Sequence, residues 1–365
     1  MRIVIDNIIF SWQRSGGISV VWGELLKGLL AASDAEVQIL EYEGASAFNI
    51  VRRHLHIAPK LLRRLSRHWF IFKRYMSRAW HFQGVASEPF IFHSSYYRYS
   101  THAKAINVVT VHDFIYERFT HSLATMIHRW QKRAALRAAD IVVCISQNTK
   151  DDLLHYYPEI SPERIRIIHN GVSDTYQPLP HEYTPPLTLQ HDSYLLFVGS
   201  RAAYKRFDIA VATAQATGQS LAIVGPPLSS AEQALLNQHR VCWHAYGYLE
   251  EQALRYLYAK ATALIYASEY EGFGIPIVEA QRCGCPVIAC GFSSIPEVIG
   301  DYPILLTRPD VTEAMSYVDR LLHEPLFREK VVSLGYANAK RFSWQRMQEQ
   351  YIQLYRDLWQ THHKP

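Results

Sequence analysis

The stretch ATALIYASEYEGFGIPIVEAQRCGCPVIACG, residues 261–291, contains a complete strand–loop–helix–strand pattern. It begins with a mostly apolar run and ends with another at 285–291, as in strands that are covered on both faces. Between these runs, Gly272 and Gly274 favour a tight turn, and Pro276 suits the first turn of a helix. The pattern predicts a parallel β-α-β unit whose loop presents backbone N–H groups at a helix start.

The same alternation of apolar runs and helical patterns extends along the whole chain. Strand candidates in the first half are RIVIDNIIF, EVQILEY, PFIFHSS, NVVTVHD, DIVVCIS and RIRIIHN, and the second half adds SYLLFVGS, SLAIVG, VCWHAYG and YPILLTR. Strands that alternate with helices form parallel, doubly wound sheets. We therefore expect an α/β fold.

The length of 365 residues exceeds what one typical core supports, so two domains are expected. A proline-rich break at 176–193 is the best linker candidate, because proline disfavours both helix and central strand. We expect Rossmann-like domains at 1–180 and 190–345. A C-terminal helix at 346–365 is expected to pack back toward the first domain.

The composition is that of a folded protein without disulfides. Hydrophobic residues make up 48% and charged residues 19% of the chain. An odd number of cysteines favours reduced thiols and a cytoplasmic setting, and Cys283, Cys285 and Cys290 are expected in the core rather than on a metal. The N-terminus is typical of a first strand rather than a signal peptide, and no apolar run is long enough to span a bilayer.

Two carboxylates flank the glycine loop of the opening stretch. Glu271 precedes the turn and Glu279 lies eight residues later in the predicted helix, too far along the chain for a close catalytic pair. They can grip separate parts of one elongated ligand through its hydroxyl groups. The alternative is that one acid is solvated and the other caps the helix start.

A second loop after a strand, FVGSRAAYKRFD, carries Arg201 and Lys205 just before a helix that begins near Phe207. A guanidinium and an ammonium at such a place can neutralise a diphosphate. An ordinary solvated basic turn is the alternative. After the first strand, the weaker signal Gly16-Gly17 opens a further helix.

Taken in order, these motifs resemble the retaining glycosyltransferases of family 4. The resemblance rests on Gly-Gly after strand one, TVHDF at 110–114, ISQNTKDDL at 145–153, IHNGV at 168–172, VGSRAAYKRFD at 198–208 and Glu-x7-Glu at 271–279. It implies a GT-B fold, in which two Rossmann-like doubly wound domains face across a cleft. One departure is that Arg201 follows Gly199-Ser200, where the family often has Gly-Arg adjacent.

The resemblance implies particular roles for residues at these motifs. Those near the reacting sugar and diphosphate would be catalytic: Glu271, His112, Arg201 and Lys205. Those that contact the rest of the donor would be Gly17, Gly272, Phe273, Gly274 and, on the ribose hydroxyls, Glu279. No Asp-x-Asp sequence occurs, so neither a metal nor another cofactor is expected besides the nucleoside diphosphate sugar.

The stretch FHSSYYR follows another predicted strand of the first half. Its residues His93, Tyr96, Tyr97 and Arg98 are candidates for binding the acceptor. Simple packing of aromatic residues is the alternative. For His112, the alternative is a satisfied histidine beneath a loop.

A basic, aromatic segment at residues 52–82 distinguishes the first half. No acid occurs between Glu43 and Glu88, whereas nine Lys and Arg residues lie between Arg52 and Arg78. Such a helix can lie on an anionic membrane, and we favour this over nucleic acid, for which no motif is present. Packing inside the first domain is the other possibility.

These features together predict an enzyme at the inner face of the cytoplasmic membrane. We expect transfer of a hexose, with a slight preference for mannose, from a GDP- or UDP-linked donor to a lipid-linked saccharide in bacterial surface polysaccharide biosynthesis. The alternatives are a GT-B enzyme acting on a soluble sugar or metabolite, and a non-catalytic sugar-nucleotide-binding protein.

Overall fold

The chain forms two compact units. The computed structural model describes residues 1–14, 16–62, 88–120, 122–180, 183, 187–190 and 193–362. The first unit comprises Met1–Gly171 together with Trp344–Pro365, and the second comprises Val172–Ser343.

A parallel sheet forms the centre of the first unit. Its strands lie in the order β3-β2-β1-β4-β5-β6-β7, with bounds β1 (Arg2–Asp6), β2 (Glu36–Tyr42), β3 (Lys60–Leu62), β4 (Phe90–Ser94), β5 (Ala105–Val111), β6 (Ile141–Cys144) and β7 (Ile165–Ile167). Ile3 on β1 pairs with Val37 on one side and Ile91 on the other. Since the order runs outward from β1 in both directions, the sheet is doubly wound.

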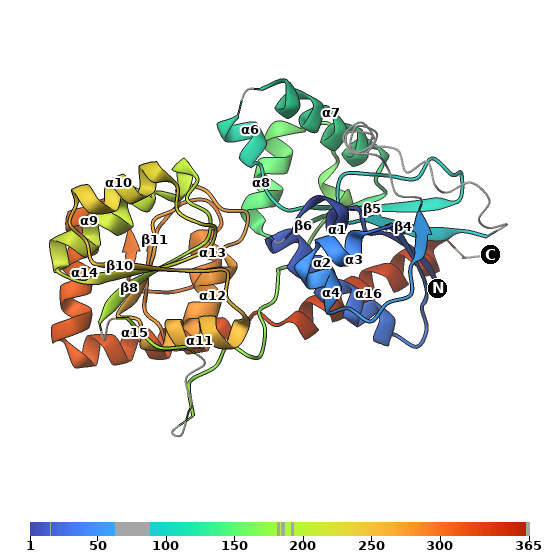
Figure 1. The fold of residues 1–365 in the computed structure, drawn as a ribbon. Coiled ribbons are helices and arrows are strands. Elements are labelled where there is room, and N and C mark those ends of the chain that lie inside the picture. Colours follow the sequence, from blue (N-terminus) through green and yellow to red (C-terminus); the bar gives the residue numbers. More distant parts are fainter. Residues whose placement is uncertain are drawn as a thin grey trace. The chain divides into compact units, whose positions relative to one another are not determined.

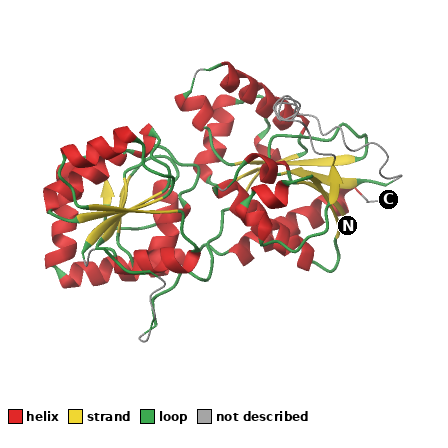
Figure 2. Ribbon diagram, viewed as in Figure 1, coloured by secondary structure: helices red, strands yellow, loops and turns green. Residues whose placement is uncertain are grey.

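Helices cover both faces of this sheet (Figures 1 and 2). They are α1 (Ile8–Trp12), α2 (Gly17–Ala31), α3 (Ala45–Phe48), α4 (Ile50–Arg53), α6 (Ile115–Phe119), α7 (Leu123–Ala138), α8 (Gln147–Tyr156) and α16 (Trp344–His362). Ser122 and Ser146 cap α7 and α8 through their side chains. The C-terminal helix α16 packs on α2, where the Gln348 side chain donates to the Glu24 carbonyl at 2.7 Å.

The second unit repeats this architecture with a parallel sheet in the order β10-β9-β8-β11-β12-β13. The strands are β8 (Tyr194–Val198), β9 (Ser220–Val224), β10 (Trp243–Gly247), β11 (Ala263–Tyr266), β12 (Val287–Cys290) and β13 (Leu305–Leu306). The helices are α9 (Phe207–Thr217), α10 (Ser230–Gln238), α11 (Glu251–Lys260), α12 (Ile275–Arg282), α13 (Ile295–Ile299), α14 (Val311–His323) and α15 (Pro325–Ala339). Cys283, Cys285 and Cys290 are buried in this unit, which confirms their expected place in a core.

The connection between the units lies earlier in the chain than the proline-rich stretch. Arg255 donates to the carbonyl oxygens of Gln177 and Pro178, and Arg282 donates to that of Ser173 at 2.9 Å. These contacts attach the beginning of the proline-rich stretch to the second unit. The expected boundary near residue 180 therefore moves to between Gly171 and Val172.

Candidate active site

Two loops meet at the carboxyl edge of the second sheet. One follows β8 and the other follows β11, and these strands are parallel neighbours. The backbone N–H of Glu269 donates to the carbonyl of Tyr204 at 2.7 Å, which joins the two loops directly. Ligands of doubly wound sheets bind at this edge.

Lys205 and Glu271 form an ion pair where these loops join. The Lys205 Nζ lies 2.7 Å from Glu271 Oε1, and the Ser268 hydroxyl donates to the same oxygen at 2.9 Å. The two side chains keep 15% and 12% of their surface exposed. A carboxylate and an ammonium are thus held together within reach of solvent.

The backbone around Glu271 is fixed by two serines. The Glu271 N–H donates to the Ser293 hydroxyl, and the Ser294 hydroxyl donates to the carbonyls of Glu271 and Phe273. Because the loop is pinned on both sides, the orientation of the carboxylate is set before any ligand binds.

The loop then turns into α12 at Gly274. This residue has a φ of +104°, a conformation that favours glycine, and a Cβ there would lie 3.2 Å from Ile277 Cδ1. No side chain caps the helix start, and Pro276 occupies its first turn. The beginning of α12 can therefore receive an anion such as a phosphate.

Glu279 lies on α12 among tyrosines. The Tyr258 hydroxyl donates to Glu279 Oε2 at 2.9 Å, and Tyr176 also donates to this carboxyl group. Burial raises the pKa of Glu279 to about 7, helped by the nearby charge of Glu251, while the two phenol groups favour the ionised form. The carboxyl group is thus poised to ionise near neutral pH.

Arg201 does not join Lys205 at the loop junction. Its guanidinium lies 2.8 Å from Glu232 Oε1 and donates to the carbonyls of Pro226 and Pro227. The side chain is buried in these contacts, so it anchors the loop after β9. In this structure Arg201 is engaged by the loop after β9 and Lys205 by Glu271. The role expected for both at a diphosphate stays a prediction.

His112 lies at the carboxyl edge of the first sheet, immediately after β5. Burial lowers the pKa of this histidine to about 4, and the Lys132 ammonium contributes in the same direction. The imidazole is therefore neutral at physiological pH, so one ring nitrogen can donate a hydrogen bond and the other can accept one.

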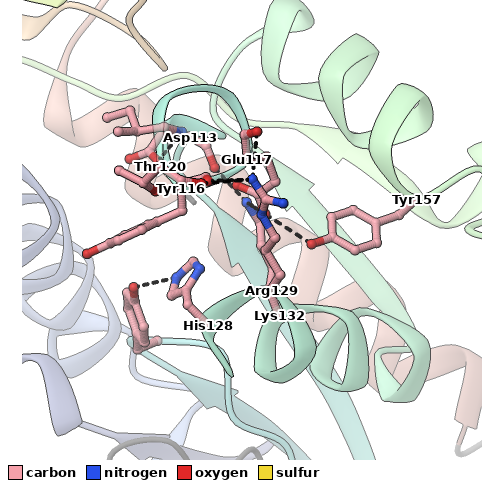
Figure 3. Close-up of polar contacts among 10 residues, drawn as sticks. Asp113, Tyr116, Glu117, Thr120, His128, Arg129, Lys132 and Tyr157 are labelled. Carbon is pink, nitrogen blue, oxygen red and sulfur yellow. Dashed lines mark hydrogen bonds and ion pairs between the residues drawn. The ribbon is translucent and has the colours of Figure 1, made fainter. Parts of the chain in front are cut away.

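A buried lysine holds the loop that carries His112 (Figure 3). The Lys132 Nζ donates to the Asp113 carbonyl at 2.7 Å, lies 3.1 Å from Glu117 Oε1 and sits 3.6 Å above the Phe114 ring. The Tyr157 hydroxyl donates to the same Glu117 oxygen at 3.0 Å. The loop after β5 is consequently a rigid element.

Gly17 begins α2 in the same unit, with Gly16 at the cap position. A Cβ at Gly17 would have no heavy atom within 4 Å. The start of α2 is therefore accessible, as a contact with a phosphate would require.

The four residues expected at the acceptor are buried. His93 is bonded on both ring nitrogens, to Tyr355 at 2.6 Å and to Thr110 at 3.0 Å, and burial lowers its pKa to about 3. Arg98 forms a buried ion pair with Asp6. In this structure His93 and Arg98 connect elements of the core through these contacts. Their expected role at the acceptor stays a prediction.

Tyr96 and Tyr97 are also buried. The Tyr96 hydroxyl lies 2.7 Å from His128 Nε2, and the rings of Tyr96 and Tyr97 pack against each other. Their surroundings match the packing alternative rather than an exposed binding surface.

Three residues that matter at these sites were not expected there from the sequence: Tyr176, Tyr258 and Lys132. Tyr176 and Tyr258 donate hydrogen bonds to Glu279 although they lie 103 and 21 positions away along the chain. For Lys132 a signal existed, because Thr125, His128 and Lys132 recur at helical spacing and so share one polar face.

Two family models cover most of the chain. The model described as Glycosyl transferases group 1 matches residues 185–341, and the model described as Glycosyltransferase Family 4 matches residues 15–176. Together they cover every strand of the two sheets except β1 (Arg2–Asp6).

Curated relatives point the same way. O-antigen chain mannosyltransferase B of Escherichia coli is 30% identical over 238 residues, which cover 61% of this chain and 62% of that protein. Alpha-maltose-1-phosphate synthase of Mycolicibacterium smegmatis is 28% identical over 262 residues, covering 64% and 67%. The chain thus matches only about two thirds of the length of these relatives.

Solved structures share the fold. Sucrose-phosphate synthase from Thermosynechococcus elongatus superposes with a TM-score of 0.72 at 18% identity, covering 99% of this chain and 100% of that one. HepE from Anabaena, in complex with UDP, gives 0.71 at 16% identity, with coverages of 97% and 99%. The chain belongs to the group 1, family 4 glycosyltransferases and has the GT-B fold, with two Rossmann-like domains.

Proposed function

We propose that the protein is a retaining glycosyltransferase that moves a hexose, preferably mannose, from a nucleoside diphosphate sugar to a lipid-linked saccharide in bacterial surface polysaccharide biosynthesis. The observation that carries the proposal is the partly exposed Lys205–Glu271 pair beside the open start of α12. The similarity to an O-antigen mannosyltransferase supports the choice of mannose and of the acceptor class.

The donor would be held mainly by the second unit. Glu279 would accept hydrogen bonds from the ribose hydroxyls, and the backbone at Gly272, Phe273 and Gly274 would meet the sugar and phosphate. Lys205 would neutralise the diphosphate as it departs. Since fixed charges and N–H dipoles act where negative charge develops, they lower the barrier to breaking the glycosyl–phosphate bond.

The reaction would exchange one bond for another at the anomeric carbon. The carbon–oxygen bond to the diphosphate breaks and its electron pair leaves with the phosphate oxygen. The acceptor hydroxyl oxygen then bonds to the same face of the sugar, and its proton passes to the departing phosphate. Glu271 would orient the sugar, with His112 as a neutral hydrogen-bonding partner and Gly17 beside the phosphates.

We further infer that the protein works at the inner face of the cytoplasmic membrane without a metal. Residues 63–82, which make up most of the basic segment at 52–82, lie outside the described residues. At its described end, Arg52 is buried and lies 2.7 Å from Glu41, so it is not part of a lipid-facing surface. Among the described helices, none has the length and apolar character needed to cross a bilayer.

Incubation with a panel of GDP-, UDP- and ADP-linked sugars tests the proposal, with lipid-linked saccharides as acceptors. We expect transfer from one donor, with the anomeric configuration retained, and loss of transfer in Glu271→Gln. If no donor gives either transfer or slow hydrolysis, the proposal is contradicted. A product with inverted anomeric configuration would contradict the retaining mechanism alone.

A soluble acceptor is the second candidate. The similarity to alpha-maltose-1-phosphate synthase favours it. Including free sugars and sugar phosphates in the same panel separates the two, because only one acceptor class should give saturable transfer.

A further inference from the structure

Helix α7 carries two cations that hold the segment directly after β5, residues 113–120 (Figure 3). Arg129 donates to three carbonyl groups at the far end of this segment, those of Tyr116, Glu117 and Thr120. Lys132 lies three positions later in α7, so the two side chains share one face of the helix. Arg129 thus fixes the end of the segment, and Lys132 is placed to reach its beginning.

The Lys132 ammonium has three close partners in this segment. Its Nζ donates to the Asp113 carbonyl at 2.7 Å, lies 3.1 Å from Glu117 Oε1 and sits 3.6 Å from the centre of the Phe114 ring. An ammonium group has three N–H donors, so one group is matched to three features of the same short stretch. Because Asp113 directly follows His112, the ammonium fixes the backbone next to that imidazole.

The five-residue helix α6 within this segment is too short to hold its position alone. No side chain caps its start at Phe114, although the Asp113 carboxylate accepts from the Ile115 N–H at 3.1 Å. That local hydrogen bond closes a turn but does not fix where the turn lies in the unit. Contacts with α7 therefore set the position of the loop that carries His112.

Stability alone does not account for a lysine at this place. Lys132 keeps none of its side-chain surface exposed, and Glu117 keeps only 3%. Taking two charges out of water costs free energy that their attraction roughly offsets, so an apolar pair of similar volume is often at least as stable. An apolar pair cannot supply a donor to the Asp113 carbonyl. The lysine is thus explained by the geometry that it imposes on the loop.

We propose that Lys132 is a positioning residue for His112, which it holds in the geometry of the transfer reaction through the Asp113 carbonyl. The proposal rests on the proposed function, in which His112 is a neutral hydrogen-bonding partner of the sugar. Burial, and then the Lys132 ammonium, lowers the pKa of His112 to about 4, which favours that neutral form. Since Lys132 is itself fully buried, it acts through His112 and does not touch the substrate.

The double variant Lys132→Met, Glu117→Leu tests this role. It removes the buried pair as a whole and keeps its volume, so no unpaired charge remains and the chain should fold. It also removes the ammonium that donates to the Asp113 carbonyl. Water must then supply that hydrogen bond, so the loop should open more often.

The matched control is Arg52→Met, Glu41→Leu. It removes another buried pair of the first unit, in which the two side chains lie 2.7 Å apart. The further hydrogen-bond partners of this pair lie outside the segment after β5, namely Asn7, Asn49 and Leu55. A loss of activity that merely follows the loss of a buried pair would appear in both double variants.

Three measurements on the full chain are compared: urea unfolding, hydrogen exchange of the amides at 115–118, and turnover of the GDP-, UDP- and ADP-linked sugars in the donor panel. Both double variants should unfold at similar urea concentrations. Only Lys132→Met, Glu117→Leu should show exchange at 115–118 that is faster by about tenfold and a kcat that is lower by roughly tenfold. Its KM for the donor should be unchanged, because the second unit would hold the donor.

Unchanged kcat or unchanged exchange in Lys132→Met, Glu117→Leu would overturn the proposal, and so would an equal fall of kcat in the control. A wild-type chain that turns over no donor of the panel would contradict the proposed function instead. Exchange at 115–118 would then decide alone whether Lys132 holds the loop, since that measurement requires no substrate.

Discussion

Three charged pairs of the first unit are buried, whereas the Lys205–Glu271 pair of the second unit keeps part of its surface exposed. The buried pairs of the first unit are Asp6–Arg98, Glu41–Arg52 and Glu117–Lys132. In the second unit, Lys205 and Glu271 stand at a glycine loop with solvent access. Two sheets of the same topology thus use charge differently, one to fix the fold and the other to present a site.

The largest effect expected from this difference is on stability. Replacing Lys132 by Met leaves Glu117 buried without its cation, and we expect the free energy of unfolding of the first unit to fall by about 3–5 kcal/mol. The same substitution at Lys205 should cost less, because its pair keeps 15% and 12% of its side-chain surface exposed, whereas Lys132 has none exposed. Urea unfolding measures both.

Equal losses in the free energy of unfolding for Lys132→Met and Lys205→Met would contradict the comparison of the two units. If Lys132→Met fails to fold, the double variant Lys132→Met, Glu117→Leu provides the test. Removing both charges should recover much of the lost stability, since a buried pair can be replaced by apolar residues at little cost.

Activity should depend more on the Lys205–Glu271 pair of the second unit than on the buried pairs of the first. Glu271→Gln keeps the shape of the side chain but removes the charge beside Lys205, and we expect kcat to fall by roughly 10²–10³-fold, as for other preorganised electrostatic contacts. Glu269→Gln, at an exposed acid two residues earlier that pairs with Arg206, is the matched control and should change kcat little. Initial rates with saturating donor decide the matter, and similar losses in both variants would argue against a special role for Glu271.

Nucleotide binding should depend on pH through Glu279. Its pKa is raised to about 7 in the fold, and ribose hydroxyls donate to the ionised form, so affinity should rise by roughly tenfold between pH 6 and pH 8. The Glu279→Gln variant is the control, because it lacks the titration while the nucleotide phosphates still titrate. Calorimetry at three pH values measures the difference, and parallel curves for the two proteins would exclude Glu279 as the source.

The raised pKa of Glu279 also makes the stability of the protein depend on pH. Because the folded pKa lies above the value of 4.5 in the unfolded chain, the contribution of Glu279 to stability is complete below about pH 4.5 and is lost as the pH rises through about 7. Glu279→Gln should therefore narrow the stability difference between pH 5 and pH 8.

The smallest expected effect concerns His93. Tyr355→Phe removes the hydrogen bond to the buried imidazole and should lower the free energy of unfolding by about 1 kcal/mol. The KM for the acceptor should stay unchanged, because His93 connects β4 to α16 rather than facing a ligand. An increase in that KM with unchanged stability would restore His93 to the acceptor site.

The fold followed from local patterns, since each buried strand and its glycine or proline turn is written in contiguous residues. The neighbourhood of Lys205 and Glu271 also followed, because both come after parallel strands. The partners of individual side chains could not be predicted from the sequence. Arg201 reaches carbonyls 25 residues away and His93 meets Tyr355 at a separation of 262, and no spacing rule encodes such partners.

The central claim is that the second unit binds a nucleoside diphosphate at Glu279 and the start of α12, with Glu271 reserved for the sugar. Isothermal titration of the full chain with UDP, GDP and ADP tests it most directly. One of the three should bind at a single site, with affinity markedly weakened in Glu279→Ala and nearly unchanged in Glu271→Gln. Binding of none of them, or binding that Glu279→Ala leaves unchanged, would contradict the account.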